Sequence, residues 1–100
     1  MSETNILFEV NTLIGKIRTS KGYWETITHK HPEVRSLLET IKEALKRPEQ
    51  IRRSKVDTAV YLFYKKVERH WLAVVIKKIN HEGFVVTAYL TDKIKEGKKI

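Results

Sequence analysis

The chain has 100 residues, of which 41% are hydrophobic and 32% are charged, as expected for one small globular domain spanning residues 1–100. It contains no cysteine, which excludes disulfides and thiolate metal sites, and no apolar run approaches the roughly 18 residues of a membrane span. Twenty Lys and Arg residues against twelve Asp and Glu give a formal net charge of +8, which favours a polyanionic partner.

The N-terminal segment MSETNILFEV lacks the order of basic, apolar and small residues that marks a signal peptide. We therefore expect a cytoplasmic protein that does not enter a membrane. Residues 5–18 favour two short extended pieces, which form a hairpin that turns near Asn11 and Thr12.

Two helices are predicted next. Thr19 or Ser20 can cap a short first helix, which runs through Ile27. Pro32 suits the first turn of a long second helix, because its missing N–H would be unpaired there. The apolar residues of this second helix share one face, and they are Val34, Leu37, Leu38, Ile41 and Leu45. Pro48 ends the helix, and the segment PEQIRR (48–53) is predicted to add one helical turn.

The second half of the chain favours strands. Segment 58–67 alternates partly, with Val60, Leu62 and Tyr64 on one face. Segment 71–79 is a nearly continuous apolar run, which is typical of a strand covered on both faces, and 83–91 is the third strand. Short connections predict a three-stranded antiparallel meander. The fold class is therefore α+β, with the N-terminal extended pieces and two helices packed on a C-terminal meander sheet.

Several kinds of catalytic site find little support. His29 and His31 form an HxH pair near Glu25, but HExxH is absent and no second carboxylate cluster supports a metal site. The glycines form neither GxGxxG nor GxxxxGK[ST], and GxSxG is also missing. We therefore predict no metal and no cofactor.

A metal-free phosphodiester site remains. The 2′-OH of RNA can attack its own neighbouring phosphate if the enzyme supplies a base, an acid and groups that stabilise the developing charge. His29 and His31 can exchange protons near neutral pH. Arg52, Arg53 and Ser54 are suited to holding a phosphate. The alternatives are a solvated corner for the histidines and a solvated helix end for the arginines.

Further candidates lie on the predicted strands. Thr87 and Tyr89 are two residues apart and therefore point to one face, opposite Val86 and Ala88. Lys77 lies late in the central strand, where it can bind a phosphate or simply reach solvent. Tyr64 is a candidate for substrate binding, and the alternative for both tyrosines is packing on the sheet.

Five segments occur in an order that resembles a known family. They are KHPE at 30–33, IRRS at 51–54, VYLFYKK at 60–66, VVIKKIN at 74–80 and GFVVTAYLTDKIK at 83–95. This order is similar to that of the small toxin-like nucleases of the barnase–EndoU–colicin–RelE (BECR) group, in its phage- and prokaryote-associated branch. The resemblance covers roughly residues 21–97. It implies helices packed on an antiparallel sheet, RNA cleavage without a metal and frequent pairing with an acidic inhibitor.

The resemblance also implies residue roles. His31 corresponds to the histidine of the HP pair and would be the general base or acid. Arg52 and Lys77 would bind and stabilise the phosphate, while Ser54, Thr87 and Tyr89 would donate hydrogen bonds. Tyr89 would also offer a surface on which a base stacks.

The predicted function is therefore a metal-independent endoribonuclease, the toxin of a toxin–antitoxin pair. Its partners would be RNA and an acidic antitoxin, with the ribosome as a further partner if cleavage requires translation. Two alternatives use the same basic charge without catalysis. One is a nucleic-acid-binding module, whose affinity would fall steeply with salt. The other is a basic domain that binds an acidic protein.

Overall fold

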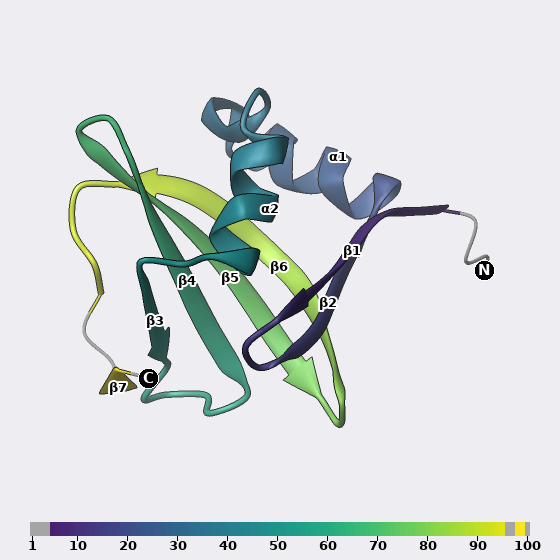
Figure 1. Ribbon diagram of the computed structural model, residues 1–100. Coiled ribbons are helices and arrows are strands. Elements are labelled where there is room, and N and C mark those ends of the chain that lie inside the picture. Colours follow the sequence, from purple (N-terminus) through teal and green to yellow (C-terminus); the bar gives the residue numbers. More distant parts are fainter. Residues whose placement is uncertain (1–4, 96–97, 100) are drawn as a thin grey trace.

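A mixed β-sheet forms the body of the protein, and its strands follow the order β1-β2-β6-β5-β4-β3-β7 (Figure 1). The computed structural model describes residues 5–95 and 98–99. The strands are β1 (Ile6–Thr12), β2 (Gly15–Ser20), β3 (Gln50–Arg53), β4 (Val60–Val67), β5 (His70–Ile79), β6 (Glu82–Thr91) and β7 (Lys98–Lys99). The helices are α1 (Lys21–Lys30) and α2 (Leu38–Lys46), with the 3₁₀ turn η2 (Pro32–Val34) between them. The α+β class is thus confirmed.

The N-terminal hairpin belongs to the same sheet as the later strands. Its turn lies at Leu13 and Ile14, two residues beyond the predicted position, because the Thr12 hydroxyl accepts a hydrogen bond from the Ile14 N–H and donates one to the Gly15 carbonyl. Gly15 takes a φ of +128°, which favours glycine. Strand β2 then pairs in parallel with the start of β6. The N-terminal extended pieces, predicted to pack on the C-terminal meander, therefore extend the meander into one mixed sheet instead.

The predicted long second helix is broken into two. The backbone N–H groups of Val34, Arg35 and Leu37 each donate to a carbonyl three residues earlier, so the segment turns more tightly than an α-helix. This turn buries Val34 fully, and α2 begins only at Leu38. The first helix follows its prediction, because the Ser20 hydroxyl accepts a hydrogen bond from the Tyr23 N–H as an N-cap.

The segment predicted as an extra helical turn is a strand. Residues 50–53 form β3, which pairs antiparallel with Tyr61–Tyr64 of β4. Ile51 is buried in the main core, and the backbone of the segment is paired with its neighbour. Pairing with a long partner strand outweighs the weak helical preference of a segment that follows a proline.

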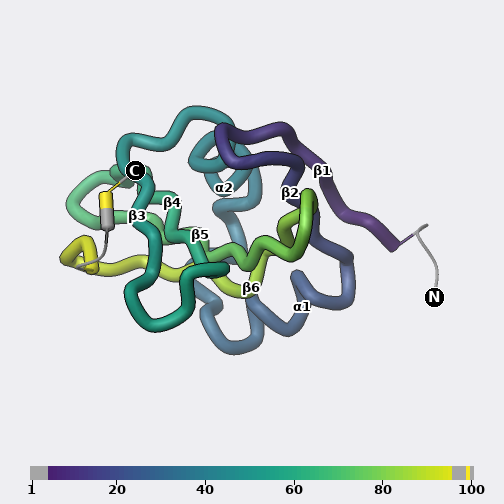
Figure 2. Tube along the Cα trace, turned by 90° about the horizontal axis from the view of Figure 1, so that it is seen from below, coloured from purple at the N-terminus to yellow at the C-terminus, as the bar shows by residue number. Residues whose placement is uncertain are grey.

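The predicted meander of β4, β5 and β6 is confirmed. Its two connections turn at Glu68 and Asn80, which both take positive φ angles. Helices α1 and α2 cover one face of the sheet, and the main core lies between them and the strands (Figure 1). Figure 2 shows the N-terminal hairpin and the C-terminal strand at opposite sides of the sheet, as the strand order requires. Within the described ranges, no helix is long and apolar enough to span a membrane.

Candidate active site on the open face

The face of the sheet opposite the helices carries its own smaller apolar cluster. Leu62, Tyr64 and Ala73 form the buried centre of this cluster, and Tyr89 and Ile94 pack against it. Alternation along the strands places these residues opposite the main core, and Leu62 and Tyr64 share one face as predicted. We call this surface the open face.

His31 lies at a fixed corner between the helices. Its N–H donates to the Ile27 carbonyl over 2.8 Å and ends α1, while its own carbonyl accepts from the Val34 N–H over 3.1 Å and starts η2. The following proline disfavours a helical backbone at the preceding residue, and His31 takes φ −130° and ψ 74°. Sequence and hydrogen bonding therefore hold this backbone in place on both sides.

The side chain of His31 reaches the open face. Strand β2 pairs with β6 only as far as Phe84, and η2 packs against β6. From this corner, the imidazole lies 5.7 Å from the ring of Tyr89, centroid to centroid. Its Nδ1 lies 3.5 Å from Oε2 of Glu33. The imidazole is thus close to both the Glu33 carboxylate and the Tyr89 ring.

A cavity of about 280 Å³ lies beside Tyr89 on the open face. We call it the open-face cavity, and it is lined by Ser54, Val60, Leu62, Val75, Thr87, Tyr89 and Lys95. Three of the predicted site residues, Ser54, Thr87 and Tyr89, therefore line one hollow, and His31 contacts the third of them. Sequence reasoning missed Lys95 as part of it, because nothing local indicates that the segment after β6 folds back over the sheet.

Burial controls the state of the two tyrosines on this face. Burial raises the pKa of Tyr89 above its usual 10.0, so the phenol keeps its proton at neutral pH and can donate a hydrogen bond. Burial also raises the pKa of Tyr64, partly offset by the hydrogen bond from the Lys95 backbone. That bond, from the Lys95 N–H to the Tyr64 hydroxyl, measures 3.1 Å and ties the C-terminal segment to the sheet. Tyr64 is fully buried, so its side chain is not exposed to a ligand on this face.

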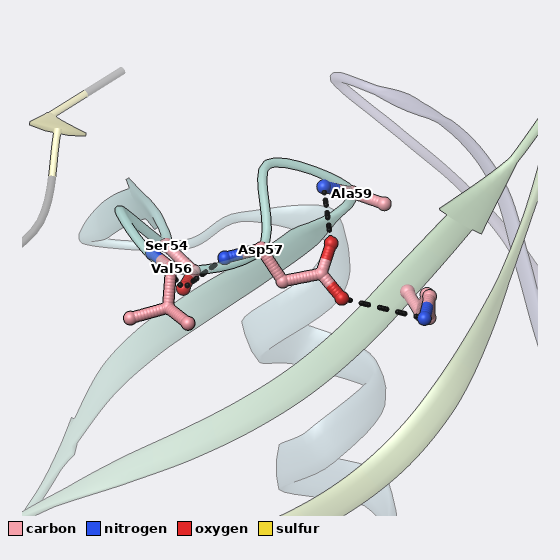
Figure 3. Close-up of polar contacts among 5 residues, drawn as sticks. Ser54, Val56, Asp57 and Ala59 are labelled. Carbon is pink, nitrogen blue, oxygen red and sulfur yellow. Dashed lines mark hydrogen bonds and ion pairs between the residues drawn. The ribbon is translucent and has the colours of Figure 1, made fainter.

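Lys77 faces the same side as Val75 but is held by an acidic loop residue. Its Nζ lies 3.3 Å from Oδ2 of Asp57. Figure 3 shows the Asp57 carboxylate with its two dashed contacts. The pKa of Asp57 lies below its usual value because its carboxylate accepts from the Ala59 N–H and from Lys77. Lys77 therefore anchors the loop between β3 and β4 in addition to any contact with a ligand.

Ser54 organises the same loop. Its hydroxyl accepts hydrogen bonds from the backbone N–H groups of Val56 and Asp57, each over 3.2 Å (Figure 3). Its own N–H donates to the Val60 carbonyl. Both of these bonds use lone pairs of the oxygen, so the hydroxyl can still donate its proton to a ligand in the open-face cavity.

The two predicted arginines point to opposite faces. Arg52 lies on the open face, where its guanidinium donates to Gln50 Oε1. Burial still raises the pKa of the neighbouring Tyr64, and the charge of Arg52 offsets only a small part of that rise. Arg53 lies on the helix side, stacked 5.3 Å over the Tyr61 ring, with its Nε donating to the Thr58 carbonyl. The structure does not bring Arg53 to the open-face cavity.

The two predicted histidines also separate. His29 is exposed on α1, in a different hollow lined by Gly22, Glu25, Thr26 and Lys30. Only His31 reaches Tyr89, and Glu33 accompanies it. The signal that could have identified Glu33 is its position two residues after His31, across a proline that bends the chain. Among residues 5–95 and 98–99, His, Asp and Glu side chains form no group of three able to hold a metal ion.

The chain was also compared with known proteins. No family model matches it, and neither a curated protein nor a solved structure matches it.

Proposed function

We propose that this protein is a metal-independent endoribonuclease of BECR type, with its active site at His31 and the open-face cavity. The observation that carries the proposal is the contact of the His31 imidazole with Tyr89, whose ring centroids lie 5.7 Å apart. Tyr89 lines a cavity together with Thr87, Ser54 and Lys95. Together these side chains supply a proton carrier, hydrogen-bond donors and a cation, which are the groups that RNA self-cleavage needs.

His31 acts as the general base or acid in this scheme. If its Nδ1 carries a proton toward Glu33, 3.5 Å away, then Nε2 is left to accept the proton of a ribose 2′-OH. Glu33 touches no substrate and is a positioning residue, because it acts by orienting the imidazole. The fixed backbone of His31 on both sides supports this role, since catalysis depends on a preset geometry.

The open-face cavity receives the scissile phosphate. Lys95 supplies a positive charge, and Thr87 and Ser54 supply hydroxyl groups. Tyr89 stays protonated and donates a hydrogen bond to the charge that develops on the phosphorane, or stacks under a base. Arg52 and Lys77 lie on the same face and extend its positive potential, although each already contacts a neighbouring side chain.

The test compares two histidine variants. Purified wild-type protein is incubated with RNA in EDTA from about pH 5 to pH 9, next to His31→Ala and His29→Ala. We expect His31→Ala to lose at least about 10²-fold in rate, the usual contribution of a general base, and His29→Ala to retain wild-type activity. Intact RNA at every pH, with and without translating ribosomes, would contradict the proposal. Equal losses in both variants would contradict the assignment of His31.

We further propose that the protein acts in the cytoplasm as the toxin of a toxin–antitoxin pair. Its net charge of +8 favours an acidic antitoxin, and the same charge favours RNA. A ribosome-dependent form would spare naked RNA and cut messages during translation, which the ribosome arm of the test detects. Salt-sensitive RNA binding without cleavage in either arm would instead identify a nucleic-acid-binding module.

A further inference from the structure

A second cavity opens where β2 and β6 part. The two strands pair only from Lys16–Arg18 to Glu82–Phe84, after which β2 leads into α1 and β6 continues. The space between them has a volume of about 390 Å³, which lies in the range of roughly 300–1,000 Å³ for small-molecule sites. We call it the edge pocket, and it is lined by Ile6, Arg18, Thr19, Ser20, Tyr23, Phe84, Val85 and Val86.

The walls of the edge pocket suit a flat ring. Most of the lining is apolar, and the guanidinium of Arg18 lies 5.1 Å over the Phe84 ring. Tyr23 contributes a second aromatic ring and is 43% exposed, which is high for a large apolar side chain. Aromatic and guanidinium planes are the surfaces on which proteins stack unpaired nucleobases.

The edge pocket lies next to the proposed active site along β6. Val85 and Val86 line the pocket, Thr87 follows directly, and Tyr89 is two residues further on. A strand rises about 3.3 Å per residue, so Val86 in the edge pocket and Tyr89 in the open-face cavity are separated by roughly 10 Å along β6. Adjacent nucleotides of one single strand can occupy both.

We propose that the edge pocket binds one unpaired nucleobase of the RNA strand whose phosphate lies in the open-face cavity. This inference rests on the proposed nuclease function, and it adds the recognition of a single-stranded substrate through a stacked base.

Binding, rather than cleavage, tests the pocket directly. The probes are short single-stranded 2′-O-methyl RNAs, which cannot be cut at the 2′ position, with one abasic site moved along the sequence. Fluorescence anisotropy at low salt measures the affinity of each probe. For wild-type protein, one abasic position should weaken binding by roughly 5- to 150-fold, the range for loss of one stacked base.

One variant alters the pocket and one matched control does not. Tyr23→Ala removes a ring that is 43% exposed. It should bind the intact probe more weakly and reduce the penalty of the abasic site. Leu13→Ala, an exposed residue at the distant hairpin turn, should behave as wild type. If a variant fails to fold, methyl NMR signals of Val85 and Val86 in wild type should shift on addition of nucleoside monophosphates.

The outcomes distinguish a failure of the edge-pocket proposal from a failure of the proposed nuclease function. An equal affinity for intact and abasic probes at every position, with no shift of those methyl signals, would overturn the pocket even if RNA is cut. Base-dependent binding lost in Tyr23→Ala would support the pocket even if RNA is never cut. A concentration-dependent dimer that Tyr23→Ala abolishes would assign the pocket to a second copy of the chain and overturn the proposal.

Discussion

The rings of His31 and Tyr89 lie 5.7 Å apart with their planes inclined by 40°, although one residue ends the first helix and the other lies in the final long strand. The contact forms because β2 leaves β6 after Phe84 and the corner before η2 packs against the rest of that strand. A proton carrier is thereby placed at a sheet face that carries hydroxyl groups.

Two substitutions test the hydroxyl and the ring of Tyr89 separately. Tyr89→Phe keeps the ring beside His31 but removes the hydroxyl, so we expect thermal stability close to wild type and a cleavage rate lower by about 10²-fold. Tyr89→Ala also removes the ring and should destabilise the fold by about 1–3 kcal/mol. Single-turnover rates and thermal melts measure both effects. Full activity in Tyr89→Phe would limit the residue to stacking or packing.

Glu33→Gln tests the orientation of His31. The exchange keeps the shape of the side chain but removes the charge 3.5 Å from Nδ1, and the pair is partly exposed, so we expect kcat to fall two- to fivefold with little change in KM. Glu39→Gln, which removes a carboxylate paired with Lys42 on α2, is the control and should leave both constants unchanged. A change in KM alone would argue for substrate contact instead.

The lowered pKa of Asp57 predicts how the stability of the fold changes at acidic pH. Its pKa in the folded protein lies below the usual 3.8, so the unfolded chain takes up the proton first as the pH falls. The ionised Asp57 carboxylate therefore stabilises the fold above about pH 4, and this stabilisation is lost as the pH falls through the folded-state pKa of Asp57. Asp57→Asn should therefore be less stable than wild type at pH 6, and the gap in melting temperature should narrow toward pH 2.5. Glu25→Gln, on the exposed side of α1, serves as the control.

Alanine substitutions at Gly83 in the sheet and at Gly22 in the first helix should have opposite effects on stability. A Cβ at Gly83 would overlap Cδ1 of the buried Ile17 where β2 meets β6, so Gly83→Ala should destabilise the fold by about 1–3 kcal/mol. A Cβ at Gly22 meets no atom within 4 Å, and alanine favours the helix, so Gly22→Ala should stabilise by up to about 1 kcal/mol. Chemical denaturation checks both signs, and a neutral Gly83→Ala would mean that Ile17 can move aside.

Local patterns predicted those features that depend on neighbouring residues. Ser20 was one of two predicted caps, with Thr19, because such a hydroxyl accepts from N–H groups within the same turn. The meander followed from alternation and short connections. The prediction for Gln50–Arg53 was wrong because a short polar strand is defined by its partner, β4, which no local pattern reveals. That error also hid the opposite directions of Arg52 and Arg53, since side-chain alternation applies only once the segment is a strand.

The candidate site also combines features that local patterns predict with features that depend on long-range packing. The sequence singled out His31, Thr87 and Tyr89, and their proximity follows from the corner at Pro32 and from strand parity. Lys95 and the ion pair of Lys77 with Asp57 depend on how the C-terminal segment and a loop return to the sheet. Such returns are set by long-range packing, and no spacing of residues encodes them locally.

Strand β2 cannot complete its pairing until β6 has left the ribosome, because the two strands come from opposite halves of the chain. During synthesis the N-terminal hairpin and both helices emerge first and must wait for a distant partner. The same late strand carries Thr87 and Tyr89, so assembly of the site coincides with closure of the sheet. A nascent chain that ends before β6 would therefore lack both the partner of β2 and two residues of the candidate site.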